Sequence, residues 1–135
     1  MDGNNDEIVE RAIVALSNGE PILVYDFEDR ENETDLVIAA SKITHTLIAR
    51  FRNEAGGLIC VAISDGAAKS LGLPFLSDII DHPLTDSSDL KYDTRSAFSL
   101  PVNHRDTYTG ITDIDREITI KRLAEVAHSA EIGEY

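Results

Sequence analysis

The sequence has 135 residues, of which 42% are hydrophobic, and its formal net charge is −13 at pH 7. A chain of this size can bury one sizeable core, so we expect a single domain over residues 1–135. The negative charge opposes binding to nucleic acid and to anionic lipid, because both require a surplus of Lys and Arg. No apolar run approaches the length of a membrane span, and the acidic N-terminus is atypical of a secretory signal. The composition therefore favours a cytoplasmic protein without a nucleic-acid or membrane partner.

Two further features of the composition limit the chemistry. Cys60 is the only cysteine, so it makes no internal disulfide and cannot by itself form a zinc site. We interpret it as a small apolar residue of a strand. Aspartate is the most frequent charged residue and lysine is scarce. This balance has two interpretations, namely adaptation to high salt and simple solubility through self-repulsion.

Helix and strand patterns follow one another along the chain. Helices are predicted, from the spacing of apolar residues or from a capping residue before them, over residues 6–16, 44–51, 64–71 and 112–127. Short apolar or weakly alternating runs predict strands over residues 21–25, 36–40, 58–63 and 97–102. The continuous apolar run over 21–25 predicts a strand that is buried on both faces. The segment 77–94 is predicted to be mainly loop. This order favours an α/β (mixed α+β) fold in which helices cover a mixed sheet.

The helix ends carry recognisable signals. Gly19 is placed where a left-handed residue would end the first helix. Thr44, Ser64 and Thr112 are the expected N-caps of the next three. The segment T-D-I-D at 112–115 resembles a capping box with Asp in place of the usual Glu.

The segment 26–35 contains six acidic residues and one arginine between the first two predicted strands. If it is extended, Glu31, Glu33 and Asp35 point to one side, because side chains alternate along an extended chain. Converging carboxylates repel one another, which makes a hard divalent cation such as Mg²⁺ a favourable common partner. The alternative is a solvated turn with no ligand. Spacing alone favours the solvated turn, but the position of the segment between two apolar strands weakens that interpretation.

Three segments in the same order resemble the 3,4-dihydroxy-2-butanone 4-phosphate synthases. The run VYDFEDRENETDL at 24–36 resembles the signature D-D-E-D-R-E-N-E-G-D of that family. GGLIC at 56–60, followed by LGLP at 71–74, resembles its G-L-I-C strand and L-x-L-P turn. FSL at 98–100, followed by TYTGITDIDR at 107–116, resembles its F-T-V strand and T-T-G-I-S-A-x-D-R segment.

The resemblance implies a lyase of riboflavin biosynthesis in a three-layer α/β fold. Such an enzyme converts ribulose 5-phosphate to 3,4-dihydroxy-2-butanone 4-phosphate and formate, using Mg²⁺, with Mn²⁺ as a possible substitute. Members are homodimers whose active site lies near the subunit interface, so we expect this chain to self-associate.

The resemblance implies a first group of site residues in the acidic segment 26–35. Glu31 would be the metal ligand and a substrate contact, and Arg30 would contact the substrate beside it. Asp35 would bind the substrate and act as an acid/base group, while Glu33 would support proton transfer. These residue types suit the reaction, because enolising a ketose needs a base near the α-carbon and a metal at the sugar oxygens.

The third matching segment supplies the other expected contacts. Thr109 and Gly110 would help to hold the sugar phosphate, and His104 precedes them and could face the phosphate. Thr112 and Asp115 are interpreted as helix caps, with Asp115 also available to pair with the following arginine.

The sequence departs from the family after residue 126. Members continue into a portion with an R-x-G-H-T segment, whose histidine is the second metal ligand, and with a later catalytic glutamate. Two explanations stay open: the chain is a fragment of an ordinary synthase, or it is a shortened relative that is inactive alone. A third hypothesis from another class is a non-catalytic acidic module that binds a cation or a partner.

Overall fold

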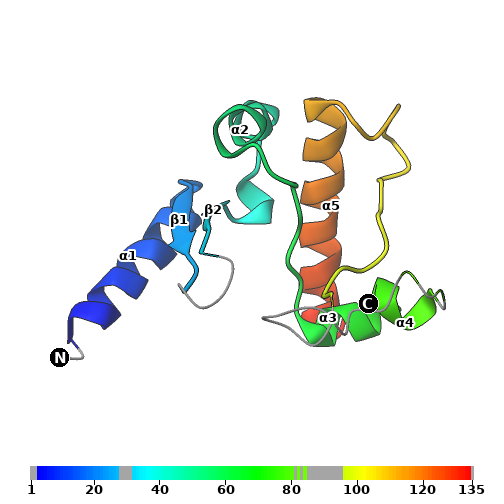
Figure 1. The fold of residues 1–135 in the computed structure, drawn as a ribbon, viewed down its shortest axis with the longest axis horizontal. Coiled ribbons are helices and arrows are strands. Elements are labelled where there is room, and N and C mark those ends of the chain that lie inside the picture. Colours follow the sequence, from blue (N-terminus) through cyan, green and yellow to red (C-terminus); the bar gives the residue numbers. More distant parts are fainter. Residues whose placement is uncertain (1–2, 28–31, 81, 83, 85–95, 135) are drawn as a thin grey trace.

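The computed structural model describes residues 3–27, 32–80, 82, 84 and 96–134. Within them, helices and one two-stranded antiparallel sheet confirm the predicted mixed class of fold. The elements in chain order are α1 (Gly3–Asn18), β1 (Ile22–Tyr25), β2 (Thr34–Val37), the 3₁₀ helix η1 (Ala40–Lys42), α2 (His45–Arg50), the π-helical turn η2 (Phe51–Ala55), α3 (Asp65–Ser70), α4 (Leu76–Ile79) and α5 (Asp113–Glu131). Figure 1 shows α1 and the hairpin on one side of α5, with α3 and α4 at its C-terminal end. None of the described helices is long and apolar enough to span a membrane.

The predicted helix caps are confirmed, although α1 spans Gly3–Asn18 rather than 6–16 and α5 ends at Glu131 rather than at residue 127. Thr44, Ser64 and Thr112 cap α2, α3 and α5, and each side chain accepts a hydrogen bond from the backbone N–H three residues later. Gly19 follows α1 in the left-handed conformation, with φ at 80°. Local sequence signals therefore decide where these helices begin and end.

The hairpin differs from the predicted pair of buried strands. Its register runs from Ile22 opposite Val37 to Tyr25 opposite Thr34, so β2 begins two residues before the predicted strand over 36–40. Leu23 is 71% exposed in β1, although we predicted burial on both faces. The prediction was wrong because burial on both faces requires layers on both sides, and apolar composition cannot supply them.

The other two predicted strands do not form in the part of the chain that is described. Residues 58–63 form no ladder with another segment. Residues 97–102 contribute a single bridge, between Ser99 and Phe75. The predicted loop over 77–94 begins inside the short helix α4. A strand is defined by its hydrogen-bonded neighbour, so an apolar run predicts only the capacity to pair.

The core lies where α2 and the segment before it meet α5. Ile43, Ile48 and Ile120 are buried together. Ile59 and Val61, from the segment 58–63, pack against them. Ile48 is 0% exposed. This small cluster places α2 and α5 side by side.

Charged side chains reinforce the same contact. One carboxylate oxygen of Glu117 on α5 accepts from the backbone N–H of His45 at 2.6 Å and lies 2.8 Å from its Nδ1. The other accepts from Lys121 Nζ at 2.7 Å. Arg52 of η2 donates two hydrogen bonds to the carboxylate of Asp113, at 2.8 and 2.7 Å. Lys121, followed by His45, lowers the pKa of Glu117 to about 2.

Replacing Ile48 with Ala should destabilise the fold by about 2–5 kcal/mol, because a buried side chain is lost and a cavity remains. Ile114→Ala is the matched control, since Ile114 lies on α5 and is 62% exposed; its effect should stay within about 0.5 kcal/mol. Urea unfolding followed by circular dichroism measures both. Equal effects of the two substitutions would contradict the assignment of the core.

Glu117→Gln should remove a pH-dependent part of the stability. The folded pKa of Glu117 is about 2, below its ordinary value of 4.5, so its contribution is present above pH 4.5 and is lost as the pH falls towards 2. The difference in urea midpoint between wild type and variant should therefore shrink over that range. Glu125→Gln, on the exposed side of the same helix, serves as control. A difference that does not change with pH would refute this account.

Candidate active site

Two of the predicted catalytic carboxylates lie on the second half of the hairpin. Asp35 is in β2 opposite Val24, and the Asp26 N–H extends the ladder by donating to the Glu33 carbonyl at 2.9 Å. Side chains two residues apart along a strand point to the same face. Glu33 and Asp35 are both exposed. The hairpin therefore presents both carboxylates to solvent on one face.

The two other predicted residues of this segment, Arg30 and Glu31, lie outside the described residues, so their roles stay predictions. Asn32, the first described residue after them, has φ at 55°, in the left-handed region that Asn tolerates better than most residues. Its Oδ1 accepts a hydrogen bond from the Tyr25 hydroxyl at 2.7 Å. This hydrogen bond ties the residue before Glu33 to the end of β1.

The donor set of the hairpin suits a hard cation. Carboxylate oxygens are the ligands that Mg²⁺ prefers, usually one or two carboxylates together with water and substrate oxygens. Among the residues that the structure describes, no three His, Cys, Asp or Glu side chains are close enough together to hold a metal ion. Glu33 and Asp35 thus require a further ligand, and Glu31 remains the predicted one.

The third matching segment forms a tight turn before α5, and Asp115 holds it. The backbone N–H of Tyr108 donates to Asp115 Oδ1 at 3.2 Å, and those of Thr109 and Gly110 donate to Oδ2, both at 2.9 Å. The Thr109 hydroxyl adds a weaker hydrogen bond at 3.3 Å. Asp115 is only 6% exposed. These hydrogen bonds, the Thr109 N–H first, lower the pKa of Asp115, since they favour the charged carboxylate.

Gly110 gives this turn its tight shape. Its φ is 76°, and a Cβ built there would lie 2.4 Å from the Asn103 side chain. A residue other than glycine would meet both the left-handed backbone and that contact. The glycine is therefore required by the shape of the turn.

The predicted phosphate contact His104 is half-buried and is engaged within its own loop. Its backbone N–H donates to Thr119 Oγ1 at 3.1 Å, and its Nδ1 accepts from the Asp106 N–H at 3.2 Å. Its carbonyl accepts from the Thr107 hydroxyl at 2.7 Å. Beside it is a small cavity of about 140 Å³, lined also by Leu123. These contacts anchor the segment to α5.

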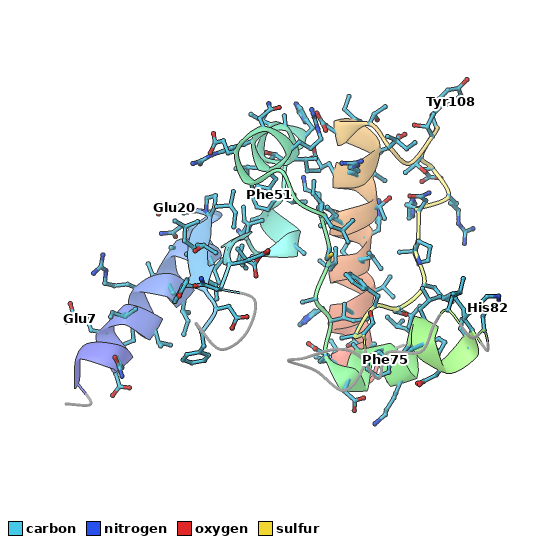
Figure 2. All side chains as sticks on the ribbon, viewed as in Figure 1. Glu7, Glu20, Phe51, Phe75, His82 and Tyr108 are labelled. Carbon is cyan, nitrogen blue, oxygen red and sulfur yellow. The ribbon has the colours of Figure 1, made fainter. Side chains whose placement is uncertain are left out.

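The two groups of predicted site residues are not brought together by the described part of the chain. Figure 1 shows the hairpin with Glu33 and Asp35 on one side of α5 and the loop with Thr109 on the other. Tyr108, at the tip of that loop, is 96% exposed and points away from the body in Figure 2. A site that used both groups would require another element or another subunit.

Sequence reasoning missed the role of Asp115. We predicted a capping box, and the Thr112 side chain does accept from the Asp115 N–H at 3.1 Å. The Asp115 carboxylate, however, binds the turn before the helix. No ion pair between Asp115 and Arg116 occurs among the described residues. The spacing T-x-x-D signals only a helix start, and nothing in it indicates which amides the acid will bind.

Comparison with known proteins places these observations in a family. The family model of 3,4-dihydroxy-2-butanone 4-phosphate synthase matches residues 10–133. The synthase of Archaeoglobus fulgidus is 48% identical over 92% of this chain, and that of Methanosarcina mazei is 45% identical over 96%. The chain spans 56% of the length of each of these two relatives.

Solved structures agree with the sequence comparison. A 3,4-dihydroxy-2-butanone 4-phosphate synthase in complex with two magnesium ions is 32% identical, with a TM-score of 0.68 over 85% of this chain and 50% of that one. A two-domain synthase from A. baumannii is 30% identical, with the same TM-score over 85% of this chain and 31% of that one. The chain therefore belongs to the 3,4-dihydroxy-2-butanone 4-phosphate synthase family.

Proposed function

We propose that this chain is the N-terminal portion of an enzyme that converts ribulose 5-phosphate to 3,4-dihydroxy-2-butanone 4-phosphate and formate in riboflavin biosynthesis. The observation that carries the proposal is the hairpin, which presents Glu33 and Asp35, both within the segment that resembles the family signature, on one exposed face. Family membership supports the same activity. Because the chain spans 56% of its archaeal relatives, we propose this activity for the whole protein.

Each hairpin carboxylate has a proposed role in enolising the ketose. Asp35 accepts the proton from the carbon next to the carbonyl, and Glu33 supports the proton transfers that follow. Arg30 contacts the substrate. Glu31 would hold Mg²⁺, or Mn²⁺ in its place, and the cation would supply stabilisation of the negative charge on the sugar oxygens. A synthase solved with two magnesium ions supports the choice of a divalent cation.

The turn before α5 has a proposed supporting role in the same site. Thr109 and Gly110 would lie against the sugar phosphate, with His104 behind them. Since the hairpin and this turn are on opposite sides of α5, we propose that a homodimer completes the site. Exposed apolar residues such as Leu23 and Leu58, 71% and 76% exposed, support self-association.

The exposed carboxylates of Glu33 and Asp35 also support a second candidate function. A chain with two exposed carboxylates and one further ligand can bind a cation weakly without catalysing a reaction. The alternative is therefore a non-catalytic module that binds a divalent cation or a partner.

Formate release from ribulose 5-phosphate with Mg²⁺ separates the two functions. Asp35→Asn and Glu31→Gln should each reduce turnover at least about a hundredfold in the longer gene product, because a general base or a metal ligand is lost. Asp65→Asn is the control, since Asp65 is exposed on α3 and pairs with Lys69. Thermal unfolding should be little changed in all three variants.

The outcomes are distinct. Formate release that depends on Asp35 and Glu31 supports the synthase. Magnesium binding by the chain, together with no formate release by the longer product, supports the non-catalytic module. Unchanged turnover in Glu31→Gln would remove Glu31 from the metal site.

A further inference from the structure

Three consecutive backbone amides before α5 converge on a single buried carboxylate. The N–H groups of Tyr108, Thr109 and Gly110 all lie within 3.2 Å of an Asp115 oxygen. Successive amides that point into one concavity form an anion-binding nest. A left-handed residue is typical of such a nest, and Gly110 has φ at 76°. The turn is therefore an anion site whose occupant is part of the chain itself.

Among the described residues, the Asp115 side chain makes no hydrogen bond outside the turn that would explain its position. The helix is capped separately by Thr112. The reciprocal hydrogen bond of a capping box, from the Thr112 N–H to the Asp115 carboxylate, does not occur among the described residues. Every hydrogen bond that its side chain is seen to make goes to residues 108–110. Within the part of the chain that the structure describes, the carboxylate therefore binds only the turn.

We propose that Asp115 is a positioning residue, which fills the nest and thereby keeps the Thr109 and Gly110 amides away from the substrate phosphate. The functional part of this inference rests on the proposed synthase activity. An external phosphate would have to displace a carboxylate that already accepts three N–H groups. The turn then contacts the substrate through groups other than these amides, such as the Thr109 hydroxyl, whose two hydrogen bonds are both long at 3.3 Å. Groups outside this turn then neutralise the charge of the substrate phosphate.

The inference is tested first without substrate, by amide hydrogen exchange of the 135-residue chain measured by NMR. Asp115→Ala should speed exchange of the amides of residues 108–110 by about tenfold or more, while the amides in the middle of α5 keep their protection. Added acetate should restore protection in a saturable manner, because it occupies the emptied nest. Sodium chloride at equal ionic strength should not. Protection that is unchanged in the variant, or that acetate fails to restore, would overturn the proposal.

Two further variants separate positioning from general stabilisation of the helix. Asp113→Ala removes the same charge from the same turn of α5, but its carboxylate binds Arg52, so the three amides should keep their protection. Asp115→Asn keeps the volume, and its one carboxamide oxygen can accept from Thr109 and Gly110 in place of Oδ2. The Tyr108 amide alone should then exchange faster. If Asp113→Ala exposes the amides equally, the effect belongs to the helix end and the proposal is wrong.

The catalytic consequence is measured separately in the longer gene product. Asp115→Ala should lower kcat/KM for ribulose 5-phosphate by about tenfold or more, because the emptied nest would capture the substrate phosphate in a nonproductive position, and acetate should recover part of it by filling the nest. If wild type releases no formate, the proposed function fails while the exchange experiment still decides the role of Asp115. If the wild type is active and Asp115→Ala leaves kcat/KM unchanged, the positioning role in catalysis is refuted.

Discussion

Helix α5 is the element on which the other segments depend, because its buried face meets a different neighbour at each turn. Asp115 binds the amides of the preceding loop, and Thr119 accepts from the His104 N–H one turn later. Ile120 packs with Ile43 and Ile48 in the core. A helix repeats every 3.6 residues, so positions 115 and 119 share the side that faces the loop, while position 120 is turned by about 100° from 119 and faces the core. These positions together order segments from distant parts of the sequence. The loop with Thr109 and the helix α2 are thereby held at fixed positions relative to each other.

Electrostatics supports this arrangement in a chain with a net charge of −13. Two cations lie where segments meet: Arg52 binds Asp113 between η2 and α5, and Lys121 binds Glu117 beside α2. Asp115 needs no cation at all, because backbone amides stabilise its charge. In contrast, Glu33 and Asp35 are exposed on the hairpin. The acids on α5 thus hold the fold together, while those of the hairpin are available to a cation or a substrate.

The sequence predicted the residue types of the candidate site, but it predicted their spatial arrangement only in part. The residues of the hairpin follow from the run of acids and its resemblance to one family, and the structure places Glu33 and Asp35 on one face of a real ladder. The sequence did not predict that Thr109 and Gly110 direct their amides into Asp115. Nor did it predict that α5 separates this turn from the hairpin, since spacing along the chain carries no information about which side of a helix a loop will follow.

Caps, turns and family membership were determined by the sequence itself, because they rest on interactions within a few residues or on matching residue types. Thr44, Ser64 and Thr112 cap their helices as expected for that reason. Strand pairing and burial were decided only by the tertiary structure. Residues 58–63 are apolar enough for a strand, yet form no ladder in the described part of the chain, since pairing requires a neighbour from a distant segment. The partner of Asp115 was decided in the same way, by the path of the loop over α5.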